Sequence, residues 1–294
     1  MRTLQATLSM AGCDSAIIGS ILCILLSASC VTPTSLLRHT ESGKIRPFSK
    51  LSSGRATSPG GEIFEYSFGW KGIPGARFRI ETREAQIGGR DLIGIGFSGS
   101  TLKSVNWAWS YRLNGITYIN PGTRLPISSA RISTEKGETE LTLLAFDRDQ
   151  SVVSSVEREL YGTHELSKKT LHFQQGLDIP SALMFIRKLD WQVGQTHRIE
   201  VVADDVQIIE LTASRTTEIE TRAGIFDAIV VDVQIRPTVH EEQGGQEAEK
   251  YRGGQIWLSR DERHLILMVQ ADIFVGYVYA ELVDFQNPAR RYPN

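Results

Sequence analysis

The sequence predicts a mainly β protein, in which a curved antiparallel sheet approaches an open barrel and one short helix docks on it. Three observations support this prediction. Many segments alternate apolar and polar residues with a period of two, Gly, Asp and Asn separate these segments, and one segment has helical periodicity instead. Successive strands joined by short turns form an antiparallel meander.

The first predicted hairpin opens with an aromatic strand. In EIFEYSFGW, aromatic residues alternate with small or charged ones and therefore share one face. These aromatic residues are Phe64, Tyr66, Phe68 and Trp70. The turn KGIPG follows, and the alternation in ARFRIE predicts the second strand of the hairpin.

A second aromatic strand is predicted in VNWAWSYRL, where the same alternation places Trp107, Trp109 and Tyr111 on one face. Later strands have similar patterns and similar turn residues. They are expected in ETELTLLAFDRD, THRIEVVA, DVQIIELTASRTTEIET, GIFDAIVVDVQI, GGQIWLS and HLILMVQADIFVGYVYAEL.

The stretch LDIPSALMFIRKLDW predicts a helix. Asp178 is suited to an N-cap, Pro180 is suited to the first turn, and apolar residues follow at helical spacing. The apolar face consists of Ile179, Leu183 and Ile186. We expect one helix over about residues 179–189, docked on the sheet.

The amino terminus has the features of a secretory signal. Residues 16–28 are apolar and uncharged, but they are too few for a membrane span, which needs roughly 20 residues. Small residues at positions 27–29 suit a signal peptidase, and Cys30 follows them. This arrangement resembles the bacterial lipobox, which implies that residues 1–29 are a signal peptide and that Cys30 carries a covalent lipid.

Cysteine usage supports lipidation. Of the three cysteines, Cys13 and Cys23 would leave with the signal, so Cys30 would be unpaired in an oxidising compartment. A lipid gives that thiol a role. We therefore expect a protein of the bacterial cell envelope, anchored to a membrane and facing the periplasm or the exterior. The alternatives are soluble secretion after cleavage near Ser29, and a retained signal anchor or a cytoplasmic protein.

Residues 30–60 predict a flexible basic tether behind the lipidated cysteine. They lack periodicity and are rich in Ser, Thr, Pro and Gly. Five cations against one anion in residues 31–60 give this segment a net charge of +4. We interpret this positive charge as a feature that keeps the segment soluble. The alternative is that it attracts the segment to anionic lipid headgroups. Residues 61–294 then form a single β-rich domain, and the whole-chain charge of −2 argues against a nucleic-acid partner.

The folded part resembles a bacterial envelope family known as domain of unknown function 3108, from about Gly61 to Leu282. The segments that carry the resemblance occur in the family's order. They are GEIFEYSFGWKGIPGARFRIETRE, YINPGTRLPISSARI, FDRD at 146–149, DIPSALMFIRKLDWQVGQ, GIFDAIVVDVQI and IWLSRDERHLILMV. The resemblance implies a curved antiparallel sheet in a secreted or lipid-anchored protein, and it implies no established activity.

The sequence contains no catalytic or metal-binding motif. The six histidines lack metal-ligand spacing, and THEL at 163–166 and HEEQ at 240–243 have no third ligand nearby. GFSGS at 96–100 does not match a nucleophile elbow, and GGRDLIGIG opens no helix that could bind a nucleotide. Asp261 in WLSRDERH is either a functional carboxylate or, as we favour, a turn residue that caps backbone N–H groups. We therefore expect no enzyme, no metal and no cofactor besides the lipid.

The aromatic residues are the feature with functional potential. Either they pack as ordinary core, or part of their surface lines a cavity for an apolar ligand. We expect a non-enzymatic binding or assembly module for a lipid, another hydrophobic ligand or an envelope partner. The alternatives are a secreted hydrolase whose site the sequence does not reveal, and a purely structural envelope protein.

Overall fold

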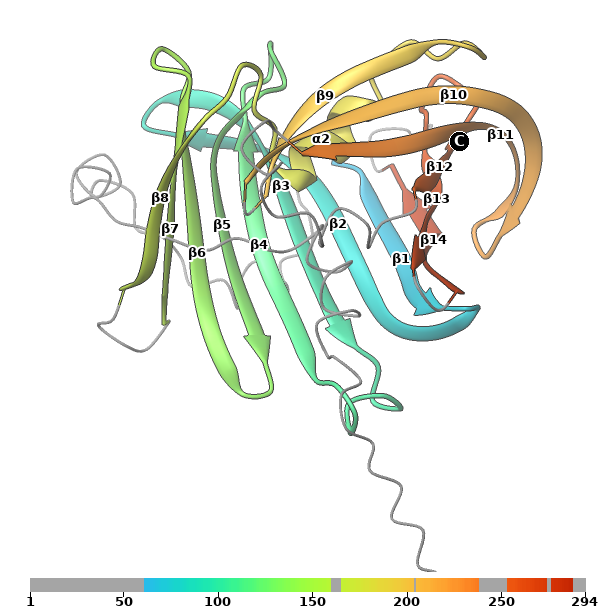
Figure 1. Cartoon of the computed structure of the whole chain (residues 1–294), viewed down its shortest axis with the longest axis horizontal. Coiled ribbons are helices and arrows are strands. Elements are labelled where there is room, and N and C mark those ends of the chain that lie inside the picture. Colours follow the sequence, from blue (N-terminus) through green and yellow to red (C-terminus); the bar gives the residue numbers. More distant parts are fainter. Residues whose placement is uncertain (1–60, 160–164, 204, 238–252, 274–275, 288–294) are drawn as a thin grey trace, which may run out of the picture.

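The computed structural model describes residues 61–159, 165–203, 205–237, 253–273 and 276–287. Cys30, the predicted signal peptide and the predicted tether lie outside these residues, as do the first two residues of THEL and all of HEEQ. Figure 1 shows a strongly curved sheet with one helix on its concave side. The predicted fold class, a mainly β protein with a curved antiparallel sheet and a docked helix, is confirmed.

The described strands form one antiparallel sheet of 14 strands, in the order β8-β7-β6-β5-β4-β3-β2-β1-β14-β13-β12-β11-β10-β9. Its amino-terminal half comprises β1 (Ile63–Trp70), β2 (Ile73–Ile87), β3 (Arg90–Thr101), β4 (Tyr111–Ile119), β5 (Pro126–Glu135), β6 (Glu138–Asp147), β7 (Val152–Glu159) and β8 (Glu165–His172). Its carboxy-terminal half comprises β9 (Thr196–Val202), β10 (Val206–Thr221), β11 (Gly224–Pro237), β12 (Gly254–Ser259), β13 (Ile266–Ile273) and β14 (Gly276–Gln286). Because β8 and β9 are the two edges, the sheet is not closed into a barrel.

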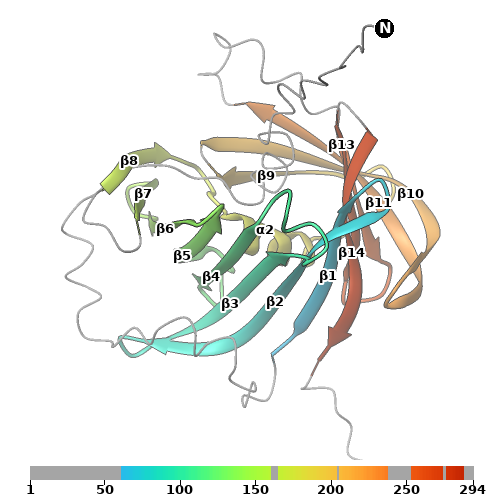
Figure 2. The same ribbon diagram turned by 90° about the horizontal axis from the view of Figure 1, so that it is seen from below.

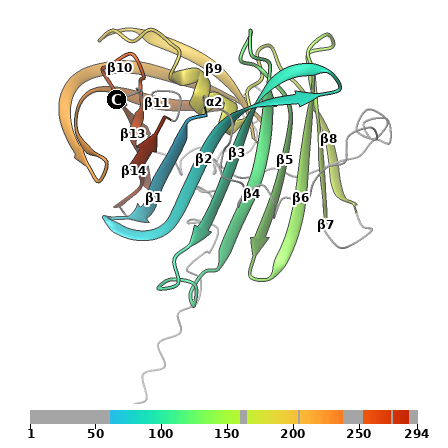
Figure 3. The same ribbon diagram turned by 180° about the vertical axis from the view of Figure 1, so that it is seen from behind.

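The two halves meet where β1 pairs with β14. The first and last strands therefore lie side by side, and the meander runs outward from this pair in both directions. Seen from below, the sheet curls around the helix α2 (Ile179–Ile186), which lies between the two halves (Figure 2). The view from behind shows the broad face formed by β2 to β8 (Figure 3).

The predicted β1–β2 hairpin is present, but its turn is shorter than the predicted KGIPG, because β2 already begins at Ile73. Lys71 and Gly72 form the two-residue turn, and both have positive φ, at 47° and 80°. Two positive φ values are typical of the turn whose twist matches that of a tight hairpin, and glycine adopts them without strain.

The helix begins as predicted and ends earlier than predicted. Asp178 is the N-cap, and its carboxylate accepts a hydrogen bond from the Ser181 N–H at 3.1 Å. The helix ends at Ile186 rather than near residue 189. The indole of Trp191 donates to the Ile186 carbonyl at 3.0 Å, and the Lys188 N–H donates to Phe185 in a tighter last turn.

The prediction of a strand from residue 105 was wrong. Residues 102–110 form turns, in which the N–H groups of Asn106 and Trp109 donate to carbonyls four residues earlier, and β4 begins at Tyr111. These local hydrogen bonds satisfy the backbone where the loop leaves the sheet. Trp107 is consequently 87% exposed instead of facing the core.

The main core fills the concave side of the sheet around α2. Buried side chains from both halves meet there, among them Phe64, Ile95, Leu113, Leu211 and Leu258. The helix contacts β3, β4 and β9, and it therefore closes one part of the concave side. The remaining part leaves room for a groove beside the helix.

Candidate functional site

The candidate site is an apolar groove on the concave side, between α2 and the strands around β1 to β6. It extends from Ser129 and Thr142 on β5 and β6 to Val269 and Ala280 on β13 and β14. The groove has a volume of about 120 Å³. Since one buried water needs about 10–15 Å³, this volume holds roughly ten groups of the size of a water molecule.

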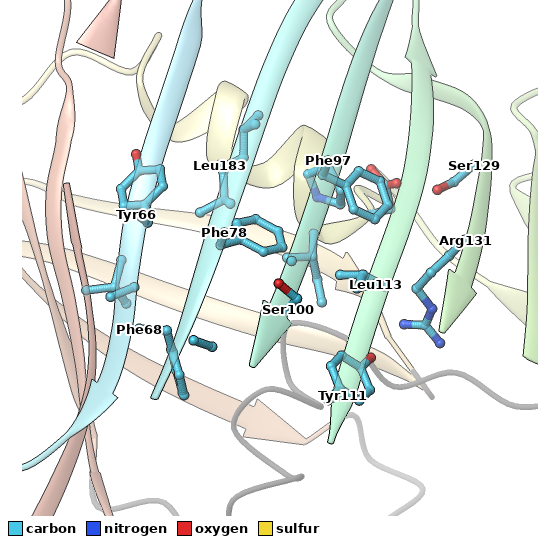
Figure 4. Close-up of a pocket in the computed structure, with 18 of the residues that line it drawn as sticks. Tyr66, Phe68, Phe78, Phe97, Ser100, Tyr111, Leu113, Ser129, Arg131 and Leu183 are labelled. Atoms are coloured by element: carbon cyan, nitrogen blue, oxygen red, sulfur yellow. The ribbon is translucent and has the colours of Figure 1, made fainter. Parts of the chain in front are cut away.

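Aromatic and aliphatic side chains dominate the groove wall. Figure 4 shows Tyr66, Phe68, Phe78 and Phe97 on the strands beside Leu183 of the helix. The strand register explains why they gather, because Tyr66 pairs with Phe78 and Ile80 pairs with Phe97 on the same face.

The seven aromatic residues that the sequence places either in the core or facing a ligand lie in different parts of the structure. Tyr66, Phe68 and Tyr111 line the groove, and Phe64 is buried in the main core. Trp109 stacks on Tyr111 with ring centroids 5.4 Å apart, and its indole donates to Glu135 at 3.1 Å.

The other two aromatic residues do not line the groove. Trp70 is 38% exposed at the end of β1, beside a register shift between β1 and β2 that interrupts the regular alternation. Trp107 is exposed on the loop between β3 and β4, where its indole donates to the Ser104 carbonyl at 3.0 Å.

A buried polar cluster lies at the helix end of the groove. The Thr117 hydroxyl donates to the Asp178 carboxylate, and Thr117 and Ser129 share a hydrogen bond at 3.0 Å. Burial raises the pKa of the Asp178 carboxyl, although hydrogen bonds from Ser181, Thr117 and Ser129 act in the opposite direction. Asp178 is therefore a helix cap that also joins α2 to β4. Among the residues that the structure describes, no histidine lines the groove to activate a hydroxyl there.

Arg131 brings a positive charge to the groove. It lies on β5, two residues beyond Ser129, and its Nη2 donates to the Thr142 hydroxyl at 3.2 Å. Its Nε is buried without a hydrogen-bond partner. Figure 4 shows Arg131 and Ser129 together on the side of the groove away from Tyr66 and Phe68. Arg131 is not recognisable as a site residue in the sequence, because a lone arginine in a polar strand gives no signal.

Behind the groove, Arg187 connects the helix to β1. Its guanidinium forms two hydrogen bonds with the Glu62 carboxylate, at 2.8 and 3.0 Å, and lies 4.7 Å from the centre of the Phe64 ring. The neighbouring Tyr66 hydroxyl donates to the Ile266 carbonyl at 3.1 Å, and burial raises its pKa far above the ordinary value. These contacts fix the position of the groove wall rather than form a reactive site.

Asp261 has the structural role favoured by the sequence. It accepts hydrogen bonds from the Arg263 N–H at 3.1 Å and the Ser259 hydroxyl at 2.8 Å, within the turn between β12 and β13. Burial disfavours its ionised form, but hydrogen bonds from Arg263 and Ser259 outweigh burial and lower the pKa of the carboxyl. Asp261 therefore belongs to a turn.

Within the described residues, no group of three or more His, Cys, Asp or Glu side chains is arranged to bind a metal ion. The part of the chain that the structure describes also contains no helix with the length and hydropathy of a membrane span.

Comparison with known proteins gives a family match. The family model described as "Protein of unknown function (DUF3108)" matches residues 65–283. A search of curated proteins found no match.

Solved structures with similar folds share little sequence with this chain. A beta-barrel-like DUF1849 protein from Brucella abortus is 10% identical with a TM-score of 0.47, and the match covers 78% of this chain and 97% of that one. A "putative lipoprotein" from Parabacteroides distasonis is 10% identical with a TM-score of 0.30, covering 77% and 95%. A "putative exported protein with YmcC-like fold" from Bacteroides fragilis is 7% identical with a TM-score of 0.28, covering 76% and 95%. With TM-scores below 0.5, these likenesses carry no functional argument.

Proposed function

The chain belongs to the DUF3108 family, which is described as a family of unknown function, and we therefore propose its function from the groove. We propose that the protein is a non-enzymatic binding module of the bacterial cell envelope, which holds an apolar molecule in the groove beside α2. In this proposal, the covalent lipid on Cys30 anchors the domain to a membrane facing the periplasm or the exterior.

The observation that carries the proposal is that α2 leaves part of the concave side unfilled. A helix that occupied the whole concave side would favour a purely structural role, and a groove lined by Tyr66, Phe68, Phe78 and Leu183 favours an apolar ligand. Binding sites for small molecules are typically concave and apolar with a few polar groups, which matches this lining.

The end of the groove that Phe68, Thr101 and Tyr111 line supports a membrane as the source of the ligand. The loop between β3 and β4 connects two strands whose ends line the groove. The β1–β2 hairpin lies beside this loop, where the Leu102 N–H donates a hydrogen bond to the Gly75 carbonyl at 2.8 Å. Exposed apolar and cationic residues occur here, and they are Ile73, Trp107, Lys71 and Lys103. Tryptophan and lysine together suit the interface between headgroups and acyl chains.

The secreted hydrolase is a weaker candidate. The Ser129 hydroxyl, which lines the groove, bonds to Thr117, and Thr117 bonds to the buried Asp178. Among the described residues, no histidine lines the groove as a base for this or the other lining hydroxyls. A nucleophile needs such a base within hydrogen-bond reach. The described geometry therefore favours binding over hydrolysis.

An uncharged naphthylamine dye that fluoresces in apolar surroundings tests the proposal. The full-length protein, purified in mild detergent, is expected to bind the dye with saturation, and long-chain alcohols are expected to displace it. Leu183→Trp places a large side chain in the groove and is expected to abolish binding, whereas Lys188→Trp adds the same side chain at an exposed position and leaves binding intact. Equal binding by the Leu183→Trp protein would refute a ligand in this groove.

A further inference from the structure

We infer that the groove selects an amphiphile with an anionic headgroup, a carboxylate or a phosphate, and that the guanidinium of Arg131 is its recognition group. This inference rests on the proposed function and adds the chemical class of the ligand. The observation behind this inference is that Arg131, a cation without a carboxylate partner, lies in the wall of a mainly apolar groove.

Arg131 is not neutralised by a carboxylate. The ion pairs within the described residues do not include Arg131, and its guanidinium donates a hydrogen bond to the neutral Thr142 hydroxyl. Its Nε is also buried without a hydrogen-bond partner. Burying part of a charged group without a counter-charge is unfavourable, and a bound anion would remove that penalty.

The carboxylates on neighbouring strands do not satisfy Arg131. Glu157 faces Thr142 on the next strand and is therefore two strands from Arg131, or about 10 Å between the backbones. Glu157 has an interaction partner of its own. Asp178 caps α2, and burial raises the pKa of its carboxyl, which lessens its repulsion of an incoming anion.

A hydroxyl group completes a headgroup site beside the guanidinium. Thr142 lines the groove, and its hydroxyl, which accepts a hydrogen bond from Arg131, can donate its own hydrogen to an oxygen of the ligand. Carboxylates and phosphates present several oxygens, and arginine binds them through two parallel N–H donors.

The apolar part of the groove extends away from Arg131. Across the sheet, the lining changes from Arg131 and Thr142 on β5 and β6 to Val269 and Ala280 on β13 and β14, with Phe78 between them. An amphiphile lying across the strands would place its head at Arg131 and its alkyl chain over the aromatic side chains. The order of polar and apolar residues thus matches that of such a molecule.

The test compares ligands with the same alkyl chain and different heads. Dodecanoate, a lysophosphatidic acid with a dodecanoyl chain, and the neutral dodecanol are titrated against the full-length protein by displacement of the naphthylamine dye. The wild-type protein is expected to bind both anions at least about tenfold more tightly than the alcohol, as expected for hydrogen bonds to a charged group. The stronger of the two anions identifies a fatty acid or a phospholipid as the source.

Arg131→Gln removes the charge and keeps a donor toward Thr142. It is expected to weaken the binding of both anions about tenfold or more, with less than about a twofold change for dodecanol. Arg77→Gln is the matched control, because Arg77 also borders the groove but is exposed.

Three results would contradict the inference. Equal affinity of the wild-type protein for dodecanol and the anions would refute it, and so would an equal loss for all ligands in Arg131→Gln. A selective loss in Arg77→Gln would place the recognition elsewhere. Absence of binding by the dye and by every ligand would refute the proposed function itself, so the two failures are distinguishable.

Discussion

Arg187 and Glu62, which are 125 residues apart in the sequence, form a bidentate ion pair that joins the end of α2 to the start of β1. The Arg187 side chain is 4% exposed and that of Glu62 is 24% exposed. The Arg187 guanidinium also donates to the Arg263 carbonyl at 3.2 Å, in the turn before β13. One side chain therefore holds together three segments behind the groove.

Replacing Arg187 by methionine is expected to destabilise the protein by roughly 3 kcal/mol, because it leaves the Glu62 carboxylate partly buried without its partner. Urea unfolding measures the change. Arg198→Ala is the control, since it breaks an exposed pair with Glu210 and is expected to cost less than about 1 kcal/mol. Similar losses for the two variants would show that the buried pair has no special role.

Asp178 is expected to make stability depend on pH. Burial raises the pKa of its carboxyl in the folded state, so the folded protein binds this proton more tightly than the unfolded chain. The contribution of Asp178 to the free energy of unfolding therefore decreases as pH rises from the ordinary carboxyl pKa of 3.8 through the raised value.

Asp178→Asn keeps an acceptor for the helix cap and removes the charge. Relative to the wild type, the variant is expected to gain stability as the pH rises from about 4 toward neutrality. Urea unfolding of both proteins across this range measures the difference. A difference that stays constant with pH would contradict a raised pKa for Asp178.

Truncation of two tryptophans is expected to change the free energy of unfolding by very different amounts. Trp191 is 5% exposed and bonds to the end of α2, so Trp191→Ala is expected to cost roughly 3 kcal/mol of unfolding free energy. Trp107 is 87% exposed, so Trp107→Ala is expected to change it by less than about 0.5 kcal/mol. A large loss for Trp107→Ala would place this side chain in the core, as the sequence pattern predicted.

The lipid anchor on Cys30 remains a prediction, because Cys30 lies outside the described residues. Globomycin, which blocks the processing of lipoprotein signals, is expected to cause accumulation of a larger precursor. A Cys30→Ser protein is expected to lose stable membrane attachment, which needs acyl chains. Unchanged mobility with globomycin, or tight membrane binding by Cys30→Ser, would be incompatible with lipidation.

The sequence predicted those parts of the fold whose signals are local. The β1–β2 hairpin was visible because Phe64, Tyr66 and Phe68 alternate regularly, and the helix was visible because Asp178 and Pro180 mark its start. Strand β3 was not predicted, since Gly94 and Gly96 remove the side chains that would show the alternation. Strand β5 was missed because polar residues such as Ser129 and Arg131 occupy the face that is apolar in β1.

The site was less predictable than the fold. Phe78 belongs to the apolar face of the alternating segment ARFRIE, but its position opposite Gly99 depends on the register of β2 and β3. Asp178 and Thr117 are 61 residues apart, and their contact depends on where α2 docks. Trp107 fits the alternation of a strand, but the local hydrogen bonds of its loop determine its exposure.

Native mass spectrometry of the full-length protein, released gently from the envelope, tests the central claim most directly. We expect a population carrying one additional, non-covalent amphiphile, which is absent from the Leu183→Trp protein and retained by the Lys188→Trp protein. A wild-type spectrum that contains unliganded protein alone, under conditions in which bound lipids survive, would contradict a ligand-binding groove.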